Sequence, residues 1–284
     1  MMKERFKKVW KIINSNTQLK IGLILFIILA CIAIFAPMIT SRSPYRLYDD
    51  LRQAPNSTYI LGTDALGRDV FTMIIYGTRV SLIIGIVATC ISGVIGTLLG
   101  AIAGFFGGKV DRFLSEVINI MLMTPTFFLI LIIIALFGSG IFKVMLVIGF
   151  TSWSGNARLM RAQAKSIRER TYVKSAMVIG ENKWKIMFKH VIPNGIFPVI
   201  ANTTMNVSGA ILMEAGLSFL GLGDPNVVSW GQIINNGRNY LNQAWWISTF
   251  AGLMVVFTVL TFFLIGDALN KVLSPKLQNM EEGK

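Results

Sequence analysis

Long apolar segments are the feature that most constrains how this chain folds. About 20 apolar residues in a helix span the ~30 Å hydrocarbon core of a bilayer, and a helix satisfies its own backbone hydrogen bonds there. Six apolar segments follow one another, at 19–39, 80–106, 118–137, 141–150 with a polar extension toward 159, 195–222 and 244–269. The fourth is the shortest, so we expect it to be tilted or buried against its neighbours. The pattern predicts an all-α integral membrane protein with six transmembrane helices.

The composition argues against a soluble protein. Hydrophobic residues make up 54% of the 284 positions and charged residues 14%, with a mean hydropathy of +0.62, a balance typical of a chain whose solvent is lipid. The basic residues behind the formal charge of +13 lie between the apolar segments, not on a soluble face, so no nucleic acid is expected as a partner. Cys31 and Cys90 lie inside apolar segments, where a thiol usually packs as a small hydrophobic group.

The distribution of basic residues predicts the orientation in the membrane. Twenty of the 27 Lys and Arg residues lie on one side, in the N-terminal segment, at 109–112, between 158 and 189, and in the tail. Because cytoplasmic flanks carry the excess of positive residues, both termini are expected in the cytoplasm. The first apolar segment follows a basic stretch, as in a signal peptide. It is too long for one and lacks a cleavage pattern, so we expect a retained span.

The same observations divide the chain into parts. We expect a cytoplasmic N-terminal segment 1–18, a first transmembrane helix 19–39, an extracytoplasmic loop 40–79, a transmembrane core 80–269 that contains a cytoplasmic loop 158–193, and a cytoplasmic tail 270–284. The prediction is therefore a multi-pass protein of the cell (inner or plasma) membrane.

Both long loops carry an amphipathic pattern. In the outer loop, helical spacing predicts a helix along the outer membrane interface, with the apolar stripe Val70, Phe71, Ile74, Ile75 and Thr78. In the inner loop, the stripe consists of Val173, Ala176, Met177, Gly180, Trp184, Met187 and Phe188. It predicts two short helices hinged at Gly180 and ended by Pro193. Such a pair could receive force from a partner or lie on anionic lipid, and the pattern alone does not decide between these roles.

Catalytic groups are scarce in this sequence. His190 is the one histidine, so a histidine triad or a two-histidine metal site cannot be assembled. No phosphate-binding loop G-x-x-x-x-G-K-[ST] is present. We therefore expect no catalytic residue, no metal site and no cofactor bound by this chain. If ATP drives transport, partner subunits must bind the ATP and its Mg²⁺.

The inner loop carries a recognisable motif. Residues 172–180, Y-V-K-S-A-M-V-I-G, and 183–194, K-W-K-I-M-F-K-H-V-I-P-N, resemble the E-A-A loop of ABC importer permeases, whose pattern is E-A-A-x-x-x-G, nine residues, then I-x-L-P. The sequence departs from that pattern at Lys174, Ser175 and His190, where Glu, Ala and Ile are usual. The variant with His-x-x-Pro-Asn is similar to the oligopeptide, dipeptide and nickel branch.

Three further stretches resemble the shorter, C-type permease subunit of that branch. They are 61–69, L-G-T-D-A-L-G-R-D, with 77–82, G-T-R-V-S-L; 214–223, E-A-G-L-S-F-L-G-L-G, with 229–231, S-W-G; and 266–270, G-D-A-L-N. The tail departs from the family's usual acidic and arginine positions at Asn270, Lys271 and Ser274.

The resemblance implies the type I ABC importer permease architecture. It implies a second homologous permease subunit, two ATPase subunits that bind ATP and Mg²⁺, and an external solute-binding protein, assembled in membrane lipid. The imported solute would be a di- or oligopeptide, or alternatively nickel or a metal chelate. Met177 and Trp184 would anchor the inner loop in an ATPase groove. The full set of implied coupling residues is Lys174, Ala176, Met177, Gly180, Trp184, Ile186, His190 and Pro193.

Polar and small residues inside the spans have two possible roles. An intramembrane acid is costly and often marks a solute path, but polar side chains also join neighbouring helices, and the sequence leaves both roles open. The candidates are Asn202, Thr203, Asn206 and Glu214. A small-residue ridge in the second span predicts close helix packing, with Gly96, Gly100, Gly104 and Gly108 at every fourth position.

Two other classes of membrane protein fit the sequence less well. A proton-coupled secondary transporter needs a titratable relay and an internal repeat. Few acids lie within or beside the apolar segments, namely Glu116, Glu214 and Asp267, and no repeat is visible. A membrane enzyme would need a set of catalytic groups that the sequence does not contain.

Overall fold

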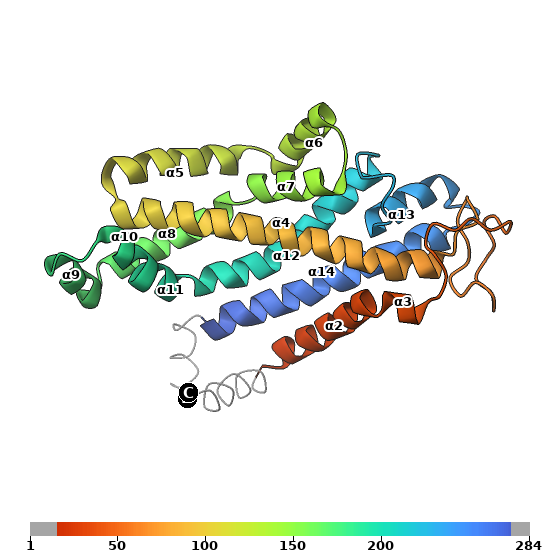
Figure 1. The fold of residues 1–284 in the computed structure, drawn as a ribbon, viewed down its shortest axis with the longest axis horizontal. Helices are drawn as coiled ribbons and strands as arrows, with labels where there is room; N and C mark the ends of the chain where they lie inside the picture. The colour runs from red at the N-terminus through yellow and green to blue at the C-terminus, as the bar shows by residue number, and fades with distance from the viewer. Residues whose placement is uncertain (1–15, 274–284) are drawn as a thin grey trace.

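All regular structure in the described part of the chain, residues 16–273 of the computed structural model, is helical (Figure 1). The elements are α2 (Thr17–Ile34), α3 (Ala36–Ile39), α4 (Val70–Phe106), α5 (Gly108–Met123), α6 (Thr126–Phe137), α7 (Ile141–Thr151), α8 (Ser154–Arg168), α9 (Thr171–Val178), α10 (Lys183–Ile186), a π-helical turn (Met187–Val191), α11 (Ile192–Gly195), α12 (Phe197–Phe219), α13 (Trp230–Gly237), a 3₁₀ turn (Arg238–Tyr240) and α14 (Trp246–Leu273). The basic residues within 1–15 and most of the predicted tail, 274–284, lie outside the described residues.

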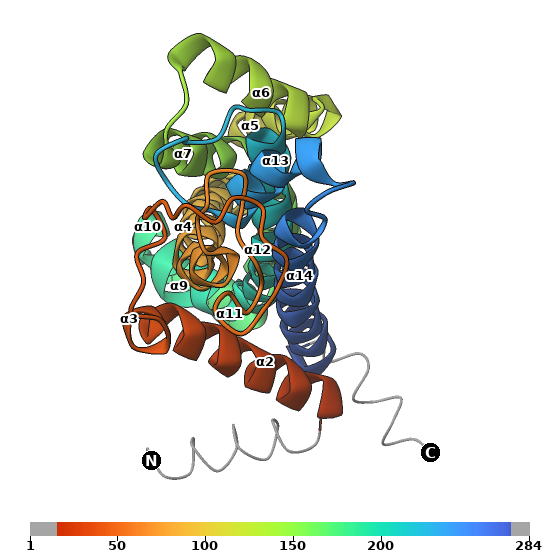
Figure 2. The ribbon, with the colours of Figure 1, turned by 90° about the vertical axis from the view of Figure 1, so that its right-hand side faces the viewer.

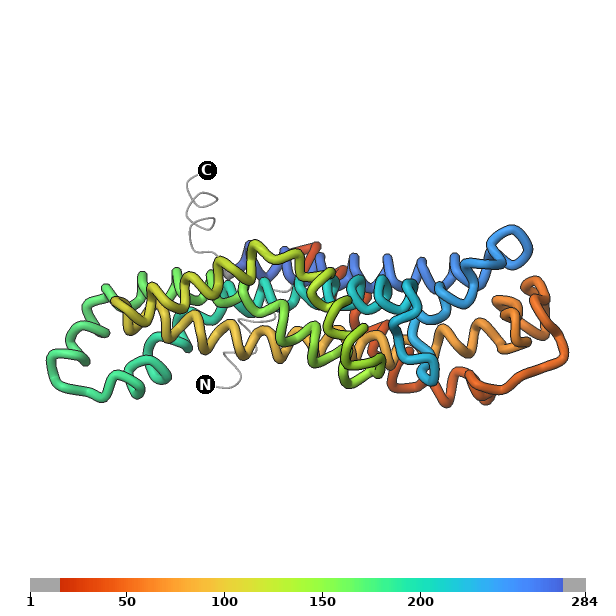
Figure 3. Tube along the Cα trace, turned by 90° about the horizontal axis from the view of Figure 1, so that it is seen from above, coloured from red at the N-terminus to blue at the C-terminus, as the bar shows by residue number. Residues whose placement is uncertain are grey.

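The long helices form an elongated bundle (Figures 1 and 3). Helices α9 and α10 lie at one end, and the loop before α4 and α13 lie at the other. Helix α2 packs on α14, and α14 packs on α12 (Figure 2). A buried cluster that includes Leu29, Ile211 and Phe262 joins these three helices. The inner loop and the outer loop therefore lie at opposite ends of the bundle.

The number of helices that could cross a membrane is smaller than predicted. In the described residues, three helices are long and apolar enough by themselves, at Thr17–Ile34, Val70–Phe106 and Trp246–Val272. Two bent pairs also qualify, Gly108–Met123 with Thr126–Phe137 and Lys183–Gly195 with Phe197–Phe219, which gives up to five spans. The predicted count of six is not confirmed, because α7 is too short to qualify.

Helix α4 includes the predicted helix of the outer loop, which is not a separate helix. It begins at Val70, well before the predicted start at residue 80, and continues to Phe106, a length of about 55 Å. Val70, Ile74 and Thr78 of the outer stripe are buried. The indole Nε1 of Trp230 donates a hydrogen bond to the Ile74 carbonyl at 3.2 Å. The stripe packs against α13 because that helix offers an apolar partner that no local pattern could reveal.

The predicted third and fourth spans are both broken. The chain bends by 85° between α5 and α6 at Pro125, whose ring favours an extended conformation at Thr124, with ψ of 126°. Helix α5 also includes 108–117, which the sequence pattern assigned to a loop. The polar extension toward 159 is not a continuation of α7 but the first part of α8, a separate helix.

Pro193 does not end the inner element, contrary to the prediction. It lies in α11, inside the continuous helical run Lys183–Gly195. The π-helical turn before it closes with a hydrogen bond from the Ile192 amide to the Met187 carbonyl. The change of direction, by 61°, comes at Ile196.

Two boundaries at the chain ends also differ from the prediction. The first helix ends at Ile34, and residues 36–39 form the separate short helix α3. The last helix continues to Leu273, so the first residues of the predicted tail are helical.

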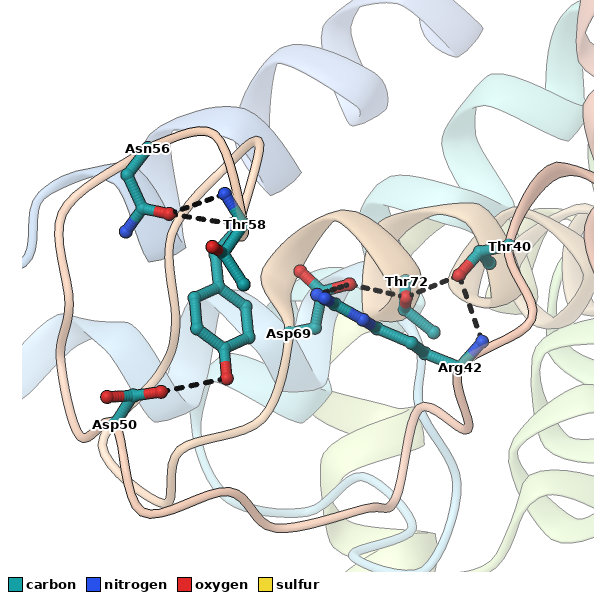
Figure 4. Close-up of polar contacts among 8 residues, drawn as sticks. Thr40, Arg42, Asp50, Asn56, Thr58, Asp69 and Thr72 are labelled. Carbon is teal, nitrogen blue, oxygen red and sulfur yellow. Dashed lines mark hydrogen bonds and ion pairs between the residues drawn. The ribbon is translucent and has the colours of Figure 1, made fainter.

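The loop before α4 is held to that helix by polar contacts (Figure 4). The Thr72 hydroxyl donates to the Asp69 carboxylate at 2.6 Å and lies 2.8 Å from the Thr40 hydroxyl. The Arg42 guanidinium lies 3.5 Å from Asp69 and stacks 4.8 Å from the ring centre of Tyr59. These contacts give the loop a fixed position at the outer end of α4.

The glycine ridge of α4 is a packing surface for α8. A Cβ atom at Gly96 would lie 2.5 Å from Cβ of Asn156, and one at Gly100 would lie 2.8 Å from Cβ of Met160. Gly104 likewise faces the α8 backbone at Arg161. Gly108 is different, because it lies in the turn to α5 with a φ of 56° and has no neighbour within 4 Å of its Cβ position.

We expect Gly100→Ala to destabilise the protein. The added methyl group would push α8 away from α4, and overpacking of this kind costs about 1–3 kcal/mol. The thermal unfolding midpoint in detergent should fall. The matched control is Gly252→Ala in α14, where a Cβ meets no neighbour within 4 Å and alanine should add about 0.5–1 kcal/mol of helix stability. Equal midpoints for the two variants would contradict the packing role.

Candidate functional site

The inner loop folds as two short helices joined at Gly180. The amide of Gly180 donates to the Met177 carbonyl and that of Glu181 donates to the Ala176 carbonyl, both at 3.1 Å. This pair of hydrogen bonds is a Schellman motif, which requires a residue with positive φ, and Gly180 has a φ of 84°. Asn182 then caps α10 by accepting from the Trp184 amide at 2.9 Å. The geometry of the turn therefore depends on Gly180.

Most apolar residues of the loop contact the chain itself. Val173, Ile186 and Met187 are fully buried in a cluster with the end of α4, and Met177 packs against that cluster. The Trp184 ring lies 4.9 Å from the ring of Phe106. The two residues expected to anchor a partner, Met177 and Trp184, thus help to hold the loop on α4, although Met177 is only half-buried and Trp184 is 50% exposed. Their role as anchors stays a prediction.

Two other apolar side chains project from the tip of the loop. Val178 is 87% exposed and Ile179 is 84% exposed, at the C-terminal end of α9. Neither belongs to the apolar stripe, so the sequence analysis missed them. The available signal was a pair of β-branched residues directly before the glycine that ends a helix.

The remaining loop candidates are charged, half-buried or exposed. Lys174 forms an ion pair with Glu169 at 2.8 Å, and His190 lies 3.5 Å from Glu181. Ala176 is half-buried and Pro193 is exposed. A hydrogen bond from Lys185 is the main factor that holds the pKa of Glu181 below its ordinary value of 4.5. A hydrogen bond from Lys174 lowers the pKa of Glu169 in the same way.

We expect the Gly180 turn to loosen in acid. Because the pKa of Glu181 is lower in the folded loop, its ion pair with Lys185 adds stability above pH 4.5 and loses it as the pH falls through the folded pKa. Amide hydrogen exchange of residues 178–186, corrected for intrinsic rates, should speed up over that range. In Glu181→Gln these amides should exchange faster at neutral pH, and their corrected exchange rate should not increase further as the pH falls. An equal increase in exchange rate in this variant would show that protonation of Glu181 is not the cause.

The four polar candidates of α12 occupy three different environments. The Asn202 amide donates to the Asn156 side-chain oxygen at 2.8 Å, and Asn206 lies on the same cavity as Asn202. Thr203 faces away, against Gly93 and a largely apolar groove. Glu214 lies near the C-terminal end of the helix, next to the segment before α13. The structure therefore brings together Asn202 and Asn206, and adds Asn156, which the sequence analysis had not singled out.

Glu214 connects α12 to the segment before α13. The hydroxyls of Ser218 and Ser229 each donate to its Oε1 at 2.7 Å, and the side chain is buried. Its second oxygen, Oε2, has no hydrogen-bond partner in the described residues. No group of three or more His, Cys, Asp or Glu side chains in residues 16–273 is placed to hold a metal ion.

Comparison with known proteins identifies the family. Residues 96–279 match the family model described as binding-protein-dependent transport system inner membrane component. The chain belongs to this family. The match includes the inner loop and α12, and the permease is accordingly a multi-pass membrane protein of the kind that the sequence predicted.

Relatives extend the match over nearly the whole permease. The dipeptide transport system permease protein DppC of Escherichia coli K12 is 37% identical, over 96% of this chain and 93% of its own length. DppC of Alkalihalophilus pseudofirmus is 34% identical, with 96% and 91% covered. The glutathione transport system permease protein GsiD of Pectobacterium atrosepticum is 33% identical, with 96% and 92% covered. These relatives are permease subunits, which agrees with a non-catalytic role.

A solved structure confirms the predicted fold class. A chain of the MetNI methionine ABC transporter, determined in inward-facing conformations, superposes with a TM-score of 0.56 at 16% identity, over 71% of this permease and 96% of that chain. The type I ABC importer permease fold is therefore confirmed, as is the family resemblance seen in the inner-loop motif.

Proposed function

We propose that the permease forms half of the translocation pathway of an ATP-driven importer for di- or oligopeptides. The observation that carries this proposal is the 33–37% identity, over 96% of the chain, to permeases named for dipeptides and glutathione. Peptide import is preferred to nickel or metal-chelate import for this reason. A second homologous permease would supply the other half of the pathway, and an external solute-binding protein would deliver the solute.

The inner loop is proposed to receive force from one of two ATPase subunits, which bind the ATP and Mg²⁺. Val178 and Ile179 present apolar surface that an ATPase groove could bury. Behind them, the contacts of Trp184 with Phe106 and of Met187 with the α4 cluster fix the loop to the bundle. A push on the tip would therefore move α4 and α8 as a unit, as a rigid-body change of conformation requires.

The exposed tip provides a direct test of this coupling. The double variant Val178→Asp, Ile179→Asp places two carboxylates where an apolar contact is proposed, and an interface residue of this kind is worth about 2 kcal/mol. The amount of ATPase that copurifies with the permease should fall at least about tenfold, and solute-stimulated ATP hydrolysis should fall with it.

Matched controls separate this coupling from a general loss of folding. Ile60→Asp makes the same kind of change at an exposed isoleucine of the outer loop and should leave ATPase copurification unchanged. If the inner loop is only a lipid anchor, the double variant would retain both the ATPases and normal stimulation, and the coupling proposal would fail.

The permease is proposed to place both termini and the inner loop in the cytoplasm. The start of α2 and the end of α14 lie together, because Lys271 donates to the Gln18 side chain at 2.9 Å (Figure 2). Both lie toward the inner-loop end of the bundle (Figure 1). The excess of basic residues at that end supports the cytoplasmic assignment.

Single-cysteine labelling in intact cells tests this orientation. In a background without Cys31 and Cys90, Arg52→Cys should react with a membrane-impermeant thiol reagent from outside. Lys185→Cys, equally exposed at the opposite end, should react only after the membrane is opened. Labelling of position 52 from the cytoplasmic side alone would reverse the topology.

A further inference from the structure

A polar cavity lies in the middle of the helical bundle. It has a volume of about 310 Å³ and lies between α4, α7, α8 and α12, next to the break between α5 and α6. Its polar lining residues are Thr89, Ser92, Thr126, Ser152, Ser154, Asn202 and Asn206. Among the described residues that line it, none is charged. We call this space the central cavity.

Several polar atoms in and beside the central cavity lack partners within residues 16–273. The Ser152 hydroxyl is buried without a hydrogen bond, and so is Nδ2 of Asn156, whose side chain is fully buried. The Asn156 oxygen is already used by Asn202. Buried polar groups are costly when unpaired, so this space is suited to a molecule that offers both donors and acceptors.

The neutral lining favours one type of occupant. A charged lining residue would favour solutes of the opposite net charge, whereas this lining does not select by net charge, which is close to zero for a dipeptide zwitterion such as glycyl-leucine. Amide and hydroxyl side chains can pair with the N–H and C=O of a peptide group whatever side chains the peptide carries. Apolar residues such as Leu122, Ile148 and Met213 complete the lining and could contact those side chains.

We propose that the central cavity is the part of the pathway in which this permease contacts the amide groups of the solute, with Asn206 and Ser152 as contact residues. The inference rests on the peptide-import function proposed above. It separates the sequence candidates, because Asn202 and Asn206 line the cavity, whereas Thr203 faces a different groove and Glu214 is occupied by two serines.

Cysteine accessibility in the assembled transporter tests whether the solute enters the central cavity. In a background with Cys31 and Cys90 replaced by alanine, Gly209→Cys should react with a small water-soluble methanethiosulfonate reagent, because Gly209 lines the cavity and a Cβ atom there meets no neighbour within 4 Å. The reaction should slow at least threefold during turnover with ATP, binding protein and the dipeptide glycyl-leucine. Ser208→Cys is the control, because Ser208 is buried against the Val259 carbonyl and should not react.

Substitution of Asn206 tests whether its side-chain amide contacts the solute. Asn206→Leu keeps similar volume but removes the amide, so peptide transported per ATP hydrolysed should fall at least tenfold while ATPase copurification stays normal. Thr204→Val, on another face of the same helix, should leave this ratio unchanged. Labelling of Gly209→Cys that peptide does not slow, or normal transport by Asn206→Leu, would overturn the inference. Failure of the proposed function would differ, because the unmodified complex would then show no dipeptide-stimulated ATP hydrolysis.

Discussion

The close approach of α4 and α8 positions the functional parts of the permease. Three glycines of α4 lie against the α8 backbone, and the Asp111 carboxylate of α5 lies 2.5 Å from Arg161 and 2.8 Å from Lys165 on α8. Since α8 leads directly into the inner loop, and that loop packs back on the end of α4, the three elements form one mechanical unit. In lipid, where apolar surface alone drives little association, such close packing has to supply the contact energy.

The buried acid and the neutral polar side chains lie in different parts of the bundle. The one buried acid of α12, Glu214, lies toward the outer end and is held by two serines that fix the segment before α13. The polar side chains that line the central cavity, among the described residues, are neutral amides and hydroxyls, and apolar residues complete the lining. This arrangement puts the acidic side chain at a structural joint and leaves the proposed solute path without a charged residue that would select among peptides.

Much of the fold could be predicted from local pattern, and the errors share a cause. The hinge position at Gly180, the packing role of three of the four glycines and the membrane class all follow from spacing and residue type. The outer stripe was misplaced because its partner, Trp230, lies far away in the sequence. The third span was taken as straight although Pro125 was visible, because hydropathy does not register backbone geometry.

The sequence by itself determined the solvent, the family and the presence of a hinged inner loop, because hydropathy, motif spacing and a glycine requirement are local properties. Only the tertiary structure decided which loop residues face outward. It placed Met177 and one face of the half-exposed Trp184 against the bundle and left Val178 and Ile179 more than 80% exposed. It also decided that Asn206, Asn202 and the serines of α4, α7 and α8 surround one space, because that meeting depends on how four helices cross.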